Sequence, residues 1–309
     1  MKVMNKAFKT MFMAIALIVC LAATASAEAV NDSINWSTGI IRVTGMGVSN
    51  PNIAVSGQHA RALSKRAAMS DAYRLLAEVI NGVQVTSDTT VQNMMISSDT
   101  IKTHVQALIQ GAKIVDVTYH GSESCEVTME MNMFGSDSLA QAILPKNTVQ
   151  EQFPAPSFAV GNTTLPRTTP PAGTNVPRVN APSGPVYSPA TPQVQRPAAV
   201  TNGYTGVIID CRELGLNPAM SPVIKCEDGT PIYGYKNLNY QYVIKHGMAG
   251  YAKDMSMATR AGSRPLIIRA IRTENHGVNP VISAADANLM LMENQGAHFL
   301  DNTNVVFLR

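Results

Sequence analysis

The sequence predicts an α+β protein of two small, sandwich-like modules, each with helices packed on one face of a mainly antiparallel sheet. Three observations lead to this fold class. A proline-rich segment divides the chain, residues 58–81 repeat apolar side chains at helical spacing, and several short runs alternate apolar and polar residues as strands do. The expected divisions are a signal peptide at 1–27, a first module at 28–150, a linker at 151–203 and a second module at 204–309.

The linker holds 11 of the 18 prolines of the chain. Proline has no N–H to give to a helix or a sheet, and the segment has too little apolar surface to offset the entropy cost of ordering it. We therefore expect a disordered, semi-stiff linker that holds the two modules apart. This organisation indicates tethering or assembly rather than catalysis.

The first 27 residues have the features of an export signal. Three lysines precede an apolar run at 11–23, which is too short to span a membrane, and small residues end the segment at Ala27. Cleavage after Ala27 is preferred over lipidation at Cys20, because Val19 is a poor residue to precede a lipid-modified cysteine. Either route exports the protein, to the periplasm or to the periplasmic face of the outer membrane.

The leader also accounts for the basicity of the chain. The whole sequence has 24 Lys+Arg and 21 Asp+Glu, and the leader holds three lysines and no acid, which leaves 21 of each. No basic run remains that would favour nucleic acid, so we expect no nucleic-acid partner.

In the first module, the apolar spacing predicts two helices and three strands. The helices are expected at 58–81 and 99–111, and the strands at 38–47, 113–119 and 125–134. Gly45 and Gly47 are assigned to a turn or bulge, since Asn50 stands where a dinucleotide-binding turn needs a third glycine. The basic face of the long helix is either an acidic-partner surface or, more commonly, a solvated face.

Several runs in this module match a family pattern. They are ARALSKRAAMSDAYRLLAE at 60–78, INGVQV at 80–85, GAKIV at 111–115 and EVTM at 126–129. Together they resemble the family of 20-kDa outer-membrane lipoproteins, to which the N-terminal domain of flagellar assembly protein T and the flagellar basal-disk protein P are similar. The resemblance covers roughly residues 38–135. It implies a non-enzymatic envelope or flagellar assembly part, of a kind often found in rings or disks near the outer membrane.

In the second module, β-branched runs and turn residues predict a mixed sheet with one helix. Strands are expected at 204–211, 223–226, 231–234, 264–272 and 304–308. Asp228-Gly229 predicts a tight hairpin turn, and Ser283 with Asp286 predicts the start of a helix that ends by Gly296.

The cysteines leave one pairing open. Cys211 and Cys226 follow neighbouring apolar runs, so they are either a disulfide closing a loop of about 15 residues or two buried free thiols. Cys125 is expected to be a buried strand residue. No spacing of Cys and His predicts a zinc site, and we expect no cofactor and no metal.

Tyrosines among Asn and Gln residues form the candidate partner or glycan surface of the second module. Its members are Tyr233, Tyr235, Tyr240 and Tyr242. Tyrosine buries a large apolar face while its hydroxyl stays wet, so such a row can bind glycan, but alternate tyrosines also pack a domain core. Three acids, Asp210, Glu227 and Asp228, suggest a carboxylate pair, although turn and capping roles explain each of them.

These observations predict an exported, non-enzymatic assembly or scaffold protein of the bacterial envelope, with a ring or disk of the flagellar basal body as the specific hypothesis. The expected partners are envelope or basal-body proteins and further copies of the chain. The alternative is a tether that binds peptidoglycan or another glycan. No catalytic motif is recognised, and an enzyme is not expected.

Overall fold

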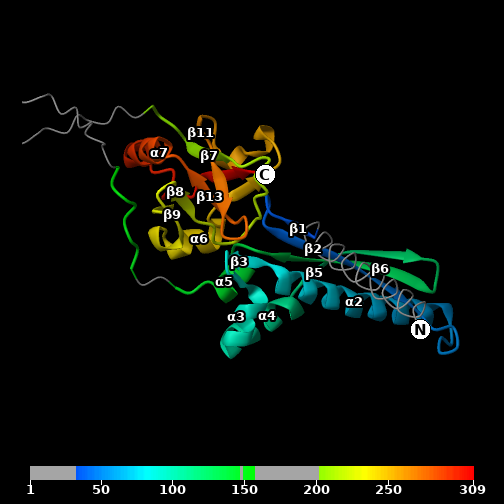
Figure 1. Cartoon of the computed structure of the whole chain (residues 1–309). Helices are drawn as coiled ribbons and strands as arrows, with labels where there is room; N and C mark the ends of the chain where they lie inside the picture. The colour runs from blue at the N-terminus through cyan, green and yellow to red at the C-terminus, as the bar shows by residue number, and fades with distance from the viewer. Residues whose placement is uncertain (1–32, 147–148, 157–201) are drawn as a thin grey trace, which may run out of the picture.

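The structure is a computed structural model that describes residues 33–146, 149–156 and 202–309. The predicted leader and most of the predicted linker lie outside these residues. Both predicted modules are present, and they mix helices with sheets, as the sequence predicts (Figure 1). The first module extends as a long arm from the second.

The arm is built on an antiparallel sheet in the order β1-β2-β6-β5. Its strands are β1 (Ile34–Asn35), β2 (Ile40–Val48), β6 (Ser124–Asn132) and β5 (Lys113–His120). Strands β2 and β6 pair along their whole length, from Ile40 opposite Asn132 to Val48 opposite Ser124. The predicted alternation of β6 is confirmed: Val127, Met129 and Met131 are buried, while the residues between them are partly exposed.

Helix α2 (Gly57–Gly82) covers β2 and β6 on one face of this sheet. Its backbone lies directly on β2 at Gly45 and Gly47, because neither has a side chain. A Cβ at Gly47 would lie 2.1 Å from the nitrogen of Ala68, and a Cβ at Gly45 would lie 2.2 Å from the nitrogen of Ala72. The assignment of both glycines to a turn or bulge is therefore wrong: they lie within β2 and admit the helix.

Smaller elements gather where the arm meets the second module. They are the hairpin β3 (Gln84–Thr86) and β4 (Thr89–Thr90), and the helices α3 (Val91–Ser97), α4 (Asp99–Gln110) and α5 (Leu139–Ile143). Ser98 caps α4 by accepting from the backbone N–H of Ile101, which starts the helix where the sequence predicts.

The second module contains two four-stranded sheets rather than one mixed sheet. The first sheet is parallel, in the order β10 (Gly250–Ala252), β14 (Val305–Leu308), β7 (Gly206–Asp210) and β11 (Pro265–Arg269). The second, mixed sheet has the order β12 (Arg272–Glu274), β13 (Asn279–Ile282), β8 (Ile224–Cys226) and β9 (Pro231–Tyr233). Strand β7 is buried on both faces, which is characteristic of parallel sheets and hides strand direction from the sequence pattern.

Local signals in this module are confirmed. Strands β8 and β9 pair antiparallel around the predicted turn, where Gly229 adopts a positive φ of 90°. Ser283 caps α7 (Ala284–Ala297) by accepting from the backbone N–H of Asp286. Short segments complete the module: α6 (Tyr240–His246), η1 (Tyr235–Asn237), η2 (Met255–Met257) and η3 (Thr259–Ala261).

Candidate functional site

The two modules are in direct contact, so the expectation that the linker holds them apart is wrong. Trp36, in the turn between β1 and β2, places its ring edge-on to Tyr251 of β10, with 5.5 Å between centroids. Ser37 beside it donates its hydroxyl to the carbonyl of Tyr251 at 2.6 Å. Trp36 is only 8% exposed, which makes it a buried anchor between the modules.

Backbone hydrogen bonds join the modules at two further places. The N–H groups of Met220 and Ser221 donate to the carbonyls of Gln84 and Val85 at 3.0 and 2.8 Å, so the second module continues the edge of β3. The N–H of Gly135, just after β6, donates to Ile244 of α6 at 2.8 Å. Backbone bonds of this kind fix the relative position of two segments more strictly than side-chain contact alone.

Residues 149–156 run from the first module across the second. The ring of Phe153 stacks on the buried ring of Tyr233, with centroids 6.2 Å apart and planes 4° apart. Asn237 donates its side-chain amide to the carbonyl of Gln152 at 3.1 Å, and Lys236 pairs with Glu151 at 2.8 Å. We call residues 149–156 the strap, because they bind the end of the first module to the surface of the second.

Both described ends of the predicted linker lie against helix α7. Phe153 and Ala155 of the strap line one hollow with Leu291 of α7. At the other end, Asn202 bonds both oxygens of the buried Glu293, through its backbone N–H at 2.9 Å and its side-chain amide at 2.6 Å. The two described ends of the predicted linker therefore contact the same helix, so the length of chain between them does not set the distance between the modules.

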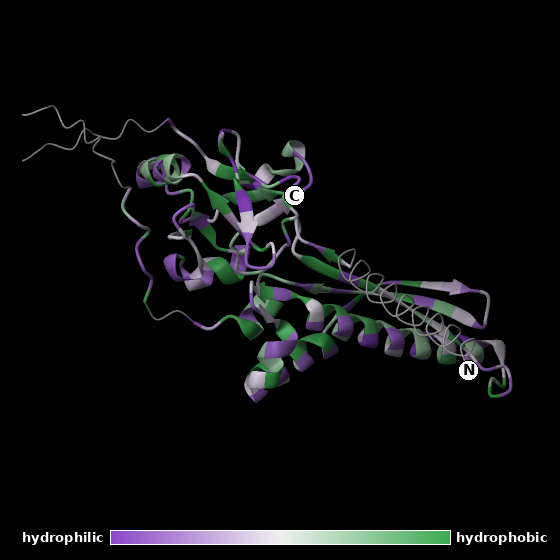
Figure 2. Ribbon diagram, in the orientation of Figure 1, coloured by the Kyte–Doolittle hydropathy of each residue, from purple (hydrophilic) through white to green (hydrophobic). Residues whose placement is uncertain are grey.

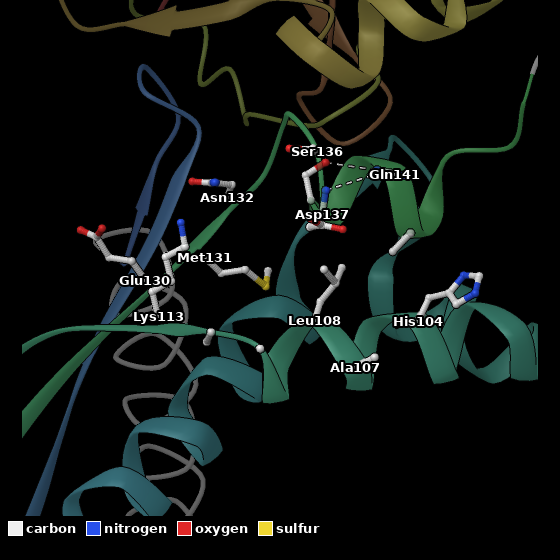
Figure 3. A pocket seen from close by; sticks show the side chains of 14 residues that line it. His104, Ala107, Leu108, Lys113, Glu130, Met131, Asn132, Ser136, Asp137 and Gln141 are labelled. Carbon is white, nitrogen blue, oxygen red and sulfur yellow. Dashed lines mark hydrogen bonds between the residues drawn. The ribbon is translucent and has the colours of Figure 1, made fainter.

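A groove of about 800 Å³ lies at the base of the arm (Figure 3). Helix α4 contributes His104 and Leu108, and the ends of β5 and β6 contribute charged and polar residues. Residues 136–142, which lead into α5, form the opposite wall, where Gln141 accepts from the backbone N–H of Asp137 at 3.0 Å. No sequence motif marks this groove, because its residues come from four separate segments.

The groove offers charged, polar and apolar contacts. Glu130 accepts from Nε of Arg42 at 2.5 Å, and Lys113 lies opposite Glu130 where β5 pairs with β6. Apolar side chains, including Leu108 and Met131, form part of the lining. Such a surface suits the binding of a polypeptide or a small polar molecule.

The tyrosine surface predicted from the sequence is not one surface. Tyr233 is fully buried and donates its hydroxyl to the carbonyl of Met248 at 2.5 Å, so including it in a surface was wrong. The hydroxyl of Tyr235 donates to Pro145 of the first module, and burial raises its pKa to about 12. Both are packing residues because apolar neighbours surround their rings.

Tyr240 and Tyr242 lie on α6 and are partly exposed. Tyr242 stacks against His246 one turn later, with 4.5 Å between ring centroids. Burial and the nearby Lys245 and Arg260 lower the pKa of His246, which keeps the imidazole neutral at pH 7. Whether these two tyrosines bind glycan stays a prediction.

The three described cysteines are free and buried. Cys211 follows the parallel strand β7 and Cys226 ends β8 in the other sheet, and burial raises the pKa of the Cys211 thiol to about 12. A thiol in such a site is protonated at neutral pH and unreactive.

The acids of the second module have structural partners. Asp210 pairs with Arg212 at 2.6 Å, and this hydrogen bond lowers the pKa of the carboxyl. Asp228 accepts from the backbone N–H of Thr230 in the hairpin turn at 2.8 Å, and Glu227 accepts from the N–H of Ala284 at the start of α7 at 2.9 Å. The turn and capping roles predicted as the alternative to a site explain all three.

Neither a metal-ligand cluster nor a membrane-spanning helix is found in the described ranges. No group of three or more His, Cys, Asp or Glu side chains there is arranged to hold a metal ion. No helix in the same ranges is both long and apolar enough to cross a membrane.

Comparison with known proteins assigns the two modules separately. Residues 54–132 match the model of the LPP20 lipoprotein family, which confirms the resemblance found in the first module. Residues 206–309 match the model for the second domain of Treponema pallidum Tp0624. A search among curated proteins gives no match. The two matches indicate an exported, envelope-associated protein.

Proposed function

We propose that this protein is a non-enzymatic assembly component of the bacterial envelope and that it acts in a ring or disk of the flagellar basal body. The match of the first module to a lipoprotein family supports the envelope assignment. The flagellar part rests on the resemblance of the same residues to flagellar assembly and basal-disk proteins. The observation that carries the proposal is the architecture: the first module docks onto the second and extends from it as an arm (Figure 1).

The arm has surfaces that suit assembly. Helix α2 covers only one face of its sheet, and the other face carries the exposed residues of β2. Strand β5 forms the last strand of this sheet, and every one of its residues is at least partly exposed. An open strand edge with exposed apolar residues, here Ile114 and Val115, is a site at which a further chain adds to a sheet.

The experiment is purification of basal bodies from the native organism, followed by detection of this protein in each fraction. The proposal predicts co-enrichment with basal-body proteins and a motility defect on deletion. Uniform distribution through the periplasm with normal motility would contradict the flagellar role and leave only the envelope assignment.

Ring formation is tested separately on purified residues 28–309. A ring gives a high molecular mass that persists on dilution, and Val115→Lys should lower that mass by placing a charge at the open edge of β5. A monomer at all concentrations would contradict self-assembly but not the envelope role.

A further inference from the structure

The far end of the arm carries an apolar cluster, which we call the tip. Its members are Met46, Val48, Ile53 and Val55, which are 60, 69, 60 and 88% exposed. Residues 46–58 contain no charged side chain, and the loop between β2 and α2 includes a hydrophobic stretch (Figure 2). Exposed apolar side chains that gather in one patch mark protein or membrane interaction sites.

The loop of the tip is held in a defined conformation. The carbonyl of Asn50 accepts from the N–H groups of Ile53 and Ala54, both at 3.1 Å. The N–H of Val55 donates to Nδ1 of His59 at 3.2 Å, and Ser56 caps α2 by accepting from the N–H of His59. These bonds hold the loop in one conformation in which Ile53 and Val55 are exposed. Binding therefore requires little further loss of conformational entropy in the loop.

Cations lie directly behind the tip. Arg61, Lys65 and Arg66 occupy the half of α2 nearest the loop, and the first acid of the helix is Asp71. The first turn of α2 has no acidic residue, so no carboxylate there offsets the positive end of the helix dipole. At 1.5 Å per residue, these cations lie about 6 to 14 Å from the start of the helix. A headgroup layer is about 5 to 8 Å deep, so Arg61 reaches this layer and the other two cations lie within about a Debye length of it.

The nearby acids do not cancel this charge. Glu123, in the turn between β5 and β6, and Glu126, which lies 3.2 Å from Nε2 of His120, are two acids against three cations, which leaves one net positive charge. Arg61 also lies over the ring of Tyr119, 5.1 Å from its centroid, which positions the guanidinium on the side of β5. The end of the arm therefore combines an uncharged apolar loop with a net positive charge on the residues behind it.

We propose that the tip docks onto an anionic phospholipid surface, with the apolar loop at the boundary of headgroups and acyl chains and the three cations at the phosphates. This combination of exposed aliphatic residues and adjacent Lys and Arg is the one that binds peripheral proteins to anionic membranes. The proposal goes beyond the envelope assembly role and does not depend on it. It gives the arm a membrane contact at the end opposite its base.

The test is cosedimentation of residues 28–309, which lack the predicted leader, with vesicles of phosphatidylcholine mixed with phosphatidylglycerol, and with vesicles of phosphatidylcholine alone. Binding should require phosphatidylglycerol and should weaken as salt is added, because the cation contribution is screened. The double variant Ile53→Ser/Val55→Ser should bind about tenfold more weakly, since its loop buries less apolar surface.

Two further variants separate the tip from general effects. Ile96→Ser on α3 changes a residue that is 78% exposed and far from the tip, and it should bind as the unchanged chain does. The triple change R61Q/K65Q/R66Q should reduce binding on the order of a hundredfold, at about 1 kcal/mol for each cation near an anionic surface. Circular dichroism verifies that each variant is folded.

Three outcomes would overturn the proposal: no binding to either vesicle, equal losses in the tip and Ile96→Ser variants, or binding that is insensitive to salt. A dimer that forms on concentration and is lost in the tip variants would also overturn it, because the occupant would then be a second copy. Failure of the flagellar test leaves this experiment unaffected, so the two results are distinguishable.

Discussion

The two modules bury their sheets in different ways. In the arm, one helix lies directly on an antiparallel sheet, and small residues of the helix meet glycines of the strand. In the second module, β7 and β14 are buried on both faces inside a parallel sheet. The arm thus leaves a sheet face, a strand edge and a tip exposed, whereas the second module buries its central strands β7 and β14. The arm is therefore the more open of the two modules.

The contact between helix and strand in the arm gives the largest expected effect. In Gly47→Ala, the new Cβ meets backbone atoms of Ser64 and Ala68 at about 2 Å, so α2 must move away from β2. We expect a loss of about 4 kcal/mol in the free energy of unfolding, measured by urea denaturation. Gly57→Ala is the matched control, since its nearest neighbour would lie 4.0 Å away. Equal stability of the two variants would contradict direct packing of the helix.

The next largest effect concerns the joint between the modules. Trp36→Ala removes the ring that packs on Tyr251 and should cost about 3 kcal/mol. Because the modules lose an anchor, thermal unfolding should change from one transition to two, as seen by calorimetry. Trp36→Phe keeps a ring and should keep a single transition. Two transitions already present in the unchanged chain would contradict cooperative docking.

The strap gives an intermediate effect. Phe153→Ala removes the ring stacked on Tyr233, and since Phe153 is only partly buried the expected loss is about 2 kcal/mol. Limited proteolysis should then cut within residues 149–156 earlier than in the unchanged chain. Lys236→Ala breaks only an exposed ion pair with Glu151, and it should leave the cleavage rate unchanged.

The smallest effect involves the edge of β2. Asp71 accepts from the N–H of Met46 at 3.1 Å, and the hydrogen bond from Arg74, followed by that from Met46, lowers its pKa. Because the pKa is lower in the folded state, the ionised carboxylate stabilises the fold at pH values above the unfolded pKa near 4. This contribution is lost as the pH falls through the folded pKa. Solvent screening limits it, so Asp71→Asn should cost about 0.5 kcal/mol at pH 7.

The pH series provides the check on that prediction. The stability difference between the unchanged chain and Asp71→Asn should shrink as the pH falls below about 4, because both side chains are then uncharged. A difference that stays constant down to pH 2 would show that the carboxylate charge plays no part.

The sequence predicted the elements better than their arrangement. The long helix, strand β6 and the hairpin at Gly229 all carry local signals, namely apolar periodicity or turn residues, and each is confirmed. The role of Gly45 and Gly47 was missed because a glycine needed for close packing looks the same in sequence as one needed for a turn. Strand direction in the second module was missed because strands buried on both faces lack alternation.

The joint between the modules was beyond sequence reasoning for a different reason. Its contacts include pairs of residues more than 130 positions apart, such as Gln84 with Met220 and Ser37 with Tyr251. Proline content signals a segment that forms no helix or sheet, but it does not say where the two ends of that segment are attached. The groove and the tip share this limit, since both combine residues from separate segments.

The central claim is that the two modules form one docked unit, and amide hydrogen exchange measured by NMR tests it most directly. The amides of Gly135, Met220 and Ser221 donate to carbonyls of the opposite module. We predict that they exchange slowly, at rates similar to the amide of Cys211, whose bond to Leu308 lies within the second module. Rapid exchange at all three positions, with Cys211 still protected, would show that the modules are folded but separate.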